Sequence, residues 1–239
     1  MAVNRKISQA EYEALIRDAW AWQEEDYGVK VWRLPDDRIV KLFRTKRRFS
    51  SARLVPYNVR FARNADRLRQ RGIRTPEILG CFHCPEIERH GVIYRLLPGR
   101  SFTELLDPVA EEGLVRRLAA FLARLHEKGV YFRSVHPGNV LLGDDGECGL
   151  IDLQDLRLSP WPLGQTARAR NFRHLFKSDP NSRGVQSYGF EPFVEHYLEA
   201  LPRNDRYRRR LKAKIMRNHR SWALAIPDLT QPRRSYPKS

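Results

Sequence analysis

Short segments rich in apolar residues predict strands in the N-terminal part of the chain. Four such segments have turn-forming residues beside them. They are residues 29–34, 39–43, 77–82 and 91–96. Strands of four to eight residues joined by short turns favour a small antiparallel sheet.

Two helices are predicted within the same region. Ser8 followed by Glu11 is a capping-box pattern, which predicts a short helix starting after Ser8. Residues 57–71 carry apolar side chains at three- and four-residue spacing, and Gly72 provides the stop signal.

From residue 97 onward the helical period dominates. Residues 97–99, Leu-Pro-Gly, form a break, and Ser101 with Glu104 is a second capping box. An apolar stripe over residues 114–125 and Arg-rich segments near the C-terminus predict further helices. We therefore expect an α+β fold with two lobes: a small antiparallel sheet lobe at 1–96 and a larger helical lobe at 97–239.

The net charge of the chain indicates which classes of partner it can bind. Among 239 residues, 44 Lys and Arg face 28 Asp and Glu, a formal net charge of +16. Residues 41–74 hold twelve basic and one acidic residue, and residues 203–220 hold nine basic and one acidic. The excess is local and calls for an anionic partner such as nucleic acid, a phosphorylated ligand or an acidic membrane surface. No DNA- or RNA-binding motif accompanies it, so nucleic acid is disfavoured.

Cysteine content and hydropathy bear on location. Three cysteines are too few for a disulfide framework, and no run of about 18 apolar residues could span a bilayer. The N-terminus has no signal-peptide core. We expect a cytoplasmic protein that is soluble or peripheral.

The candidate chemistry lies in residues 131–142, Tyr-Phe-Arg-Ser-Val-His-Pro-Gly-Asn-Val-Leu-Leu, followed by Gly-Leu-Ile-Asp at 149–152. Asn139 and Asp152 are separated by a predicted hairpin that would bring their side chains together. Mg²⁺ prefers such oxygen ligands and takes one or two from the protein, with the remainder from phosphate and water.

These motifs resemble the protein-kinase-like fold, in which a loop ending in Asn precedes a strand that carries a metal-binding Asp. The resemblance implies ATP and Mg²⁺ as cofactors, with Asn139 and Asp152 as metal ligands. It also implies that Lys41 contacts the nucleotide phosphates and that the connection containing Tyr94 and Leu96 carries the adenine.

Within that fold, the chain is similar to bacterial lipopolysaccharide-core kinases of the Kdo/heptose type, including toluene-tolerance-like members. Ser134 occupies the position of the Asp that serves as the general base in these kinases, and Asp155 is the nearby acidic residue that could replace it. The helix expected to supply an acidic partner for Lys41 offers Asn64 and Asp66. The glycine-rich phosphate loop is reduced to Gly28.

Each residue also has a purely structural interpretation. Asp152 could form an ion pair with an arginine, Asn139 could be a turn residue, and Lys41 could point to solvent by alternation. Cys81 and Cys84 have a Cys-x-x-Cys spacing but lack two further ligands nearby, which favours ordinary strand residues over zinc.

The sequence supports three hypotheses. The first is transfer of phosphate from ATP to a core sugar at the cytoplasmic face of the inner membrane, with lipopolysaccharide core or another anionic glycolipid held by the arginine clusters. The second is a non-catalytic scaffold that binds the core or a partner enzyme. The third, a nucleic-acid-binding module, rests on charge alone.

Overall fold

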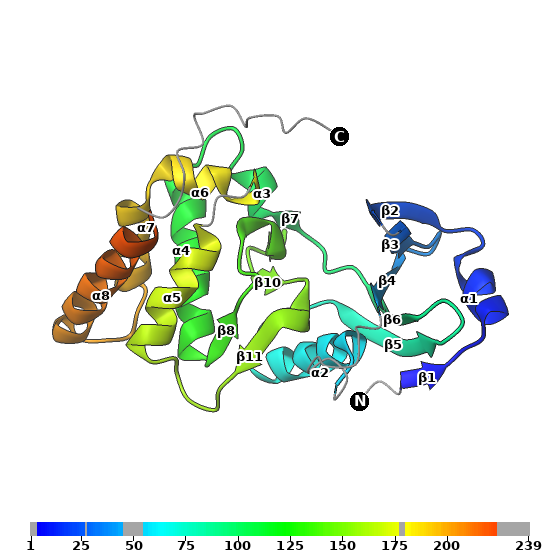
Figure 1. Cartoon of the computed structure of the whole chain (residues 1–239). Coiled ribbons are helices and arrows are strands. Elements are labelled where there is room, and N and C mark those ends of the chain that lie inside the picture. Colours follow the sequence, from blue (N-terminus) through cyan, green and yellow to red (C-terminus); the bar gives the residue numbers. More distant parts are fainter. Residues whose placement is uncertain (1–3, 27, 45–54, 177–179, 224–239) are drawn as a thin grey trace, which may run out of the picture.

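The computed structural model describes residues 4–26, 28–44, 55–176 and 180–223. They form a sheet-rich N-terminal part and a helical C-terminal part, joined by the chain between β6 and β7 (Figure 1). The α+β architecture with a smaller sheet lobe and a larger helical lobe is therefore confirmed.

The N-terminal sheet has six strands in the order β1-β5-β6-β4-β3-β2. All neighbours are antiparallel except β1 and β5, which run parallel, so the expectation of a wholly antiparallel sheet is wrong at this edge. The strands are β1 (Asn4–Lys6), β2 (Trp20–Glu25), β3 (Gly28–Arg33), β4 (Arg38–Arg44), β5 (Glu77–Cys84) and β6 (Arg89–Arg95).

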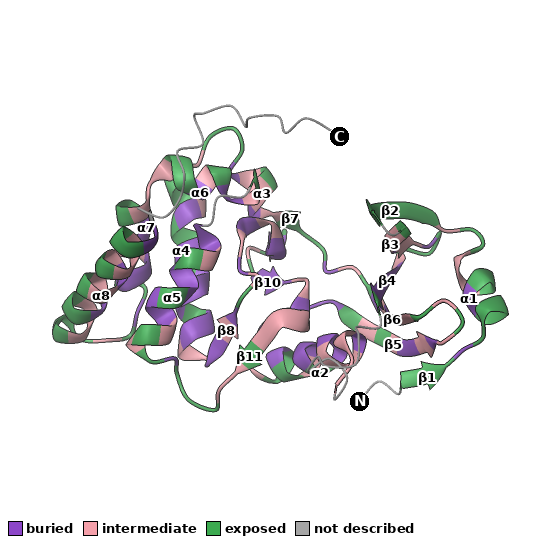
Figure 2. Ribbon diagram, in the orientation of Figure 1, coloured by how far each residue is buried: buried purple, intermediate pink, exposed green. Residues whose placement is uncertain are grey.

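The two edge strands are the ones that the sequence pattern did not predict. Every residue of β1 and β2 is exposed (Figure 2). A strand exposed on both faces has no apolar alternation, so its sequence carries no period-two signal.

Each face of the sheet is covered by one helix. Ile39 and Phe43 on β4 belong to the buried cluster that includes α2 (Tyr57–Gln70). Val40 and Leu42, on the opposite face, pack in a smaller cluster with Tyr12 of α1 (Gln9–Ile16). The Ser8 capping box predicted for α1 is present.

The described residues of the C-terminal part form six α-helices. A second capping box, at Ser101, begins α3 as expected. The apolar stripe of α4 is buried, and α4 packs on α7 while α5 packs on α8. The helices are α3 (Phe102–Leu105), α4 (Glu112–Glu127), α5 (Gln165–Leu175), α6 (Arg183–Tyr188), α7 (Phe190–Glu199) and α8 (Asp205–Ala223).

Short strands and 3-10 turns lie between the helices and the N-terminal sheet. β10 (Cys148–Leu150), β9 (Val140–Leu142) and β7 (Arg100–Ser101) form one small sheet, and β11 (Leu156–Leu158) pairs with β8 (Val130–Phe132). The 3-10 turns are η2 (Pro137–Asn139), η3 (Leu153–Asp155) and η4 (Pro180–Ser182).

One hydrophobic cluster joins the two parts through α2. It extends from Ile39 and Val92 of the sheet, through Phe61 and Leu68 of α2, to residues such as Leu150 and Leu153 of the C-terminal part. A Cβ atom on Gly149 would lie 2.4 Å from the Leu97 side chain and 3.0 Å from the Arg74 backbone. The absence of a side chain at Gly149 lets Arg74, between α2 and β5, and Leu97 approach the chain just before Asp152.

Candidate functional site

Lys41 is buried at the centre of β4. It lies on the same face of the strand as Ile39 and Phe43 and is 7% exposed, so it does not point to solvent. Its Nζ forms an ion pair with Asp152 Oδ1 and lies 5.9 Å from the ring centres of Phe43 and Phe61. Because a buried ammonium group is costly without a partner, this pair fixes both side chains.

The acidic partner of Lys41 is therefore Asp152 rather than a residue of α2. Asp66 instead forms an ion pair with Arg69 on the outside of the helix. The Asn64 Nδ2 amide donates a hydrogen bond of 2.7 Å to the carbonyl oxygen of Leu153. Thus α2 holds the backbone immediately after Asp152, and the carboxylate of Asp152 itself neutralises the charge of Lys41.

Asp152 lies at the end of β10 in the left-handed backbone region, with φ 60° and ψ 52°. Asp tolerates this conformation better than most residues, because its short side chain can bond locally. Burial acts to raise the pKa of Asp152, but the charge and hydrogen bond of Lys41, a hydrogen bond from Gln154 and the charge of Lys30 lower it below its usual range. The carboxylate is therefore ionised near neutral pH.

Hydrogen bonds of the side chain and of the backbone hold Asn139 in place at the end of η2. Its Nδ2 donates to the carbonyl oxygen of Ser134 at 2.9 Å, and its backbone carbonyl accepts from the Ile151 N–H at 3.1 Å. The first bond fixes the loop that precedes it, and the second ties it to the residue before Asp152. The amide nitrogen is thus engaged in the loop, which leaves Oδ1 as the ligand atom.

Five of the predicted site residues line one cavity of about 500 Å³. They come from β4, from β6 and the connection after it, from η2 and from the end of β10, and they are Lys41, Tyr94, Leu96, Asn139 and Asp152. Burial raises the pKa of Tyr94, so its phenol is neutral. The structure thus brings together the residues assigned to the nucleotide and to the metal, whose roles stay predictions.

Sequence reasoning missed part of this lining. Trp22 and Gln23 lie on β2, and Asn181 lies on η4. No sequence signal marked β2 as a strand, because it is exposed along its length. Asn181 reaches the site from more than 40 residues downstream through a contact between η4 and η2.

Ser134 and Asp155 do not line the cavity. The carbonyl oxygen of Ser134 accepts hydrogen bonds from Asn139 Nδ2 and from the His136 N–H, each at 2.9 Å. The backbone of Asp155 accepts from the Arg133 N–H at 3.3 Å. Ser134 is therefore built into the loop that positions Asn139, and Asp155 belongs to the turn after Asp152.

A buried polar network anchors the loop from behind. His126 of α4 bonds to Tyr197 Oη at 2.8 Å through Nδ1 and to Asn171 Oδ1 at 2.9 Å through Nε2. Asn171 in turn donates to the carbonyl oxygen of Phe132, two residues before Ser134, at 2.8 Å. Phe132 itself is fully buried. The helices thereby fix the start of the loop through the backbone of Phe132, and no side chain of the loop takes part in this bond.

This network predicts a specific loss of stability in acid. Burial, reinforced by the charge of Arg168 and opposed by the bond to Asn171, lowers the pKa of His126 to about 3. Below pH 6.5, His126 is therefore protonated in the unfolded chain, whereas it stays neutral in the folded chain until the pH approaches 3. The free energy of unfolding should therefore fall as the pH drops from 6.5 towards 3, by up to about 5 kcal/mol.

Urea unfolding of the native protein and of His126→Gln at a series of pH values measures this effect. The variant should lose most of the slope between pH 6.5 and 4. Equal slopes in the native protein and His126→Gln would mean that His126 is protonated inside the fold.

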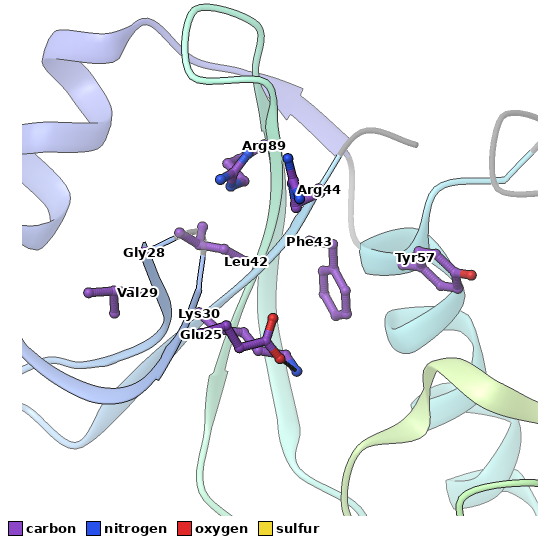
Figure 3. Close-up of a pocket in the computed structure, with 9 residues that line it drawn as sticks. All are labelled: Glu25, Gly28, Val29, Lys30, Leu42, Phe43, Arg44, Tyr57 and Arg89. Carbon is purple, nitrogen blue, oxygen red and sulfur yellow. Dashed lines mark hydrogen bonds and ion pairs between the residues drawn. The ribbon is translucent and has the colours of Figure 1, made fainter. Parts of the chain in front are cut away.

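A second cavity, of about 320 Å³, lies at the end of the N-terminal sheet (Figure 3). Glu25 and Lys30 form an ion pair at 2.5 Å on one side, and Phe43 stacks on Tyr57 on the other. Neither Asn139 nor Asp152 lines this cavity, so it is not the site predicted from the sequence.

The three cysteines are buried and do not form a metal site. Cys81 packs in the cluster that contains α2, whereas Cys84 packs in the cluster on the opposite face of the sheet with α1. Burial raises the pKa of Cys81 to about 11 and that of Cys148 likewise to about 11. Within the described residues, no three His, Cys, Asp or Glu side chains come together as metal ligands.

Residues 22–130 match the model of the phosphotransferase enzyme family APH. The matched range is slightly less than half of the chain, contains Lys41, Tyr94 and Leu96, and ends before Ser134, Asn139 and Asp152. The match agrees with the kinase-like α+β fold, and it extends from β2 of the N-terminal sheet through α4 of the helical part. No curated protein shows significant similarity to the chain.

Among solved structures, the chain is similar to WbdD in complex with the kinase inhibitor LY294002, at 17% identity and a TM-score of 0.45 over 86% of this chain and 45% of that one. It is likewise similar to the bifunctional kinase-methyltransferase WbdD, at 17% identity and a TM-score of 0.45 over 86% and 44%. A 2.2 Å structure of WbdD gives 18% identity and a TM-score of 0.43 over 91% and 48%. The chain spans less than half the length of these proteins.

Proposed function

We propose that this chain is an ATP-dependent phosphotransferase that phosphorylates a sugar of the lipopolysaccharide core. The observation that carries the proposal is the convergence of Lys41, Asn139 and Asp152 on one cavity, although Lys41 and Asp152 are 111 residues apart in the sequence. This wall of the cavity combines a buried lysine, an amide oxygen and an ionised carboxylate. Such a set of groups suits a nucleoside triphosphate with its metal ion.

The residues present fit Mg²⁺. Asn139 and Asp152 offer hard oxygen atoms, and Mg²⁺ is commonly bound by one or two protein oxygens together with phosphate and water. When bound, the ion would neutralise charge on the transferred phosphoryl group. Lys41, released from Asp152 by that ion, would hold phosphate oxygens. Tyr94 and Leu96, at the wall formed by β6 and the connection, would contact the adenine.

Catalysis by this site would rest on position and charge. Phosphoryl transfer gives the protein little covalent chemistry to perform. Ser134 cannot remove a proton near neutral pH, but its hydroxyl can accept a hydrogen bond from the acceptor sugar and orient it. We therefore expect slow transfer from an otherwise complete site.

Exposed arginines on α2 and α8 would hold the anionic acceptor or the inner-membrane surface. On α2, Arg63 and Arg67 are exposed and make no ion pair within the described residues. Arg71 and Arg74, which follow α2, bind other parts of the chain. Of the remaining basic residues in 41–74, Lys46, Arg47, Arg48 and Arg53 lie outside the described residues. No described helix is long and apolar enough to cross a bilayer.

Reversal of Arg63 and Arg67 to Glu should weaken binding to vesicles with anionic lipid by at least tenfold. Each basic side chain near such a surface contributes about 1 kcal/mol, and salt screens it over about 8–10 Å. Vesicle sedimentation at increasing salt measures the effect, with Arg100→Glu/Arg157→Glu as a control of equal charge. Undiminished binding in high salt would point to an apolar contact instead.

A non-catalytic scaffold that binds the core or a partner enzyme is the second candidate. The position of Ser134 favours it, because the residue that would act as base is absent. Mass spectrometry of the core oligosaccharide from cells with and without the protein separates the two. A phosphate group that disappears with the protein, and is not restored by Asp152→Asn, supports the kinase. Unchanged phosphate content supports the scaffold.

A further inference from the structure

A third cavity, of about 460 Å³, lies in the C-terminal part between α5, α8 and β8. The two helices pack against each other there (Figure 1). Arg170, Arg173 and His174 come from α5, and Asn218, Ser221 and Trp222 come from α8. Each set has the spacing i, i+3, i+4, which places its members on one helix face. Tyr131 of β8 completes the lining.

The cavity carries positive charge without an acidic counterpart. Arg170 and Arg173 are exposed. Within the described part of the chain they form no ion pair, and no Asp or Glu lines the cavity. Arg168, two residues before Arg170 on the same helix, shows the contrast: it is buried and bonds to Glu127, to the Leu163 carbonyl and to Tyr197. An arginine with a structural role on α5 is thus fully partnered, whereas the two at the cavity are not.

Trp222 adds a donor that the fold leaves unused. The residue is 8% exposed, and its Nε1 is buried without a hydrogen-bond partner among the described residues. Its ring lies edge-on to Phe190 and His219, at centroid distances of 6.0 and 4.7 Å, so its position is fixed by packing. A buried donor without an acceptor is costly, and Trp222 belongs to the lining of the cavity.

The other polar side chains set the rim. The Asn218 amide donates to the Ala169 carbonyl at 3.1 Å and links the two helices. Tyr131 Oη and His174 Nε2 lie 3.3 Å apart. Hydrogen bonds already link the elements around the cavity, so the cavity is preformed before a ligand binds.

We infer that this cavity is a binding site for a phosphomonoester, separate from the cleft that contains Lys41 and Asp152. Paired guanidinium groups match the oxygens of a phosphate dianion, and such charge-assisted bonds are the strong ones. A volume of about 460 Å³ falls within the range of small-ligand sites and accommodates a sugar as well as its phosphate. The two cavities share no lining residue.

Calorimetric titration with glucose 6-phosphate, inorganic phosphate and glucose tests the inference on the full-length protein. Glucose 6-phosphate should bind saturably and glucose should not. Arg170→Gln/Arg173→Gln should weaken binding at least tenfold, since a bond to a charged group is commonly worth more than the 1.4 kcal/mol that this factor represents. Trp222→Phe, which keeps an aromatic ring and removes the N–H, should weaken it several-fold.

Arg206→Gln/Arg210→Gln is the matched control, because it removes equal charge from exposed positions of α8 that do not line the cavity. It should change the affinity less than twofold, and thermal melts of all variants check that they are folded. Flotation with vesicles containing phosphatidic acid distinguishes a lipid headgroup from a soluble sugar phosphate as the source of the phosphomonoester.

Two results would overturn the inference. One is the absence of saturable binding by every phosphate probe, vesicles included. The other is an equal loss of affinity in the control pair and in the Arg170/Arg173 pair, which would indicate unspecific attraction. Neither result bears on MgATP binding at Asp152, so failure of this inference and failure of the proposed phosphotransfer can be told apart.

Discussion

Replacement of Ser134 by Asp is expected to raise the rate of phosphate transfer from ATP to the acceptor by about 10²–10⁴-fold, the range that general-base assistance contributes. The loop that holds Ser134 is already fixed through the Asn139 and Phe132 contacts. A carboxylate introduced there would therefore be added to an ordered loop. A radiolabelled ATP transfer assay with isolated core acceptor measures the rate.

Ser134→Asn is the control for size, because its amide can orient a hydroxyl but cannot take its proton. It should transfer phosphate no faster than the native protein. Asp155→Asn should reduce the native rate if Asp155 assists through a water, and should leave the rate of Ser134→Asp unchanged. If neither the native protein nor Ser134→Asp turns over ATP with any core acceptor while both bind it, the scaffold function is correct.

Substitution of Asp152 by Asn is expected to abolish the Mg²⁺-dependent part of ATP binding. The amide is nearly the same size but removes the anionic ligand, and it leaves Lys41 free to hold phosphate. ATP affinity in EDTA should therefore stay within a few-fold of native, while the gain on adding Mg²⁺, at least tenfold in the native protein, should vanish. Calorimetric titration with ATP, with and without Mg²⁺, gives both numbers.

Asp66→Asn, at the ion pair with Arg69 on α2, is the control for loss of one acidic side chain. It should retain the full effect of Mg²⁺. If Asp152→Asn also retained that effect, the metal would be bound by other groups and the assignment of Asp152 and Asn139 as its ligands would be wrong.

Local signals in the sequence predicted much of the fold. Both capping boxes, at Ser8 and Ser101, begin helices, because the pattern is complete within four residues. Lys41 faces the interior because Ile39, two positions earlier in the same strand, is part of the core. In each case the residues that make the prediction possible lie within one helical turn or one strand, so a local sequence pattern is enough.

Features that depend on distant pairing could not be predicted in this way. β2 contributes Trp22 to the cavity but is exposed at every residue, so only its partner strand reveals it. The ion pair of Lys41 with Asp152 depends on the carboxylate of Asp66 in α2 pairing with Arg69 instead, and on the position of the chain after β10. The α5–α8 cavity forms where the faces of two helices come together, and these faces are about 50 residues apart in the sequence.

The melting temperature of the native protein, with and without nucleotide, shows whether the cleft between Lys41 and Asp152 binds MgATP. A ligand at 100 times its dissociation constant stabilises the folded state by about 2.7 kcal/mol, which for a chain of this size is a rise of roughly 5–10 °C. We predict such a rise with millimolar MgATP and a smaller one with ATP in EDTA. An unchanged melting temperature at millimolar MgATP would contradict the account.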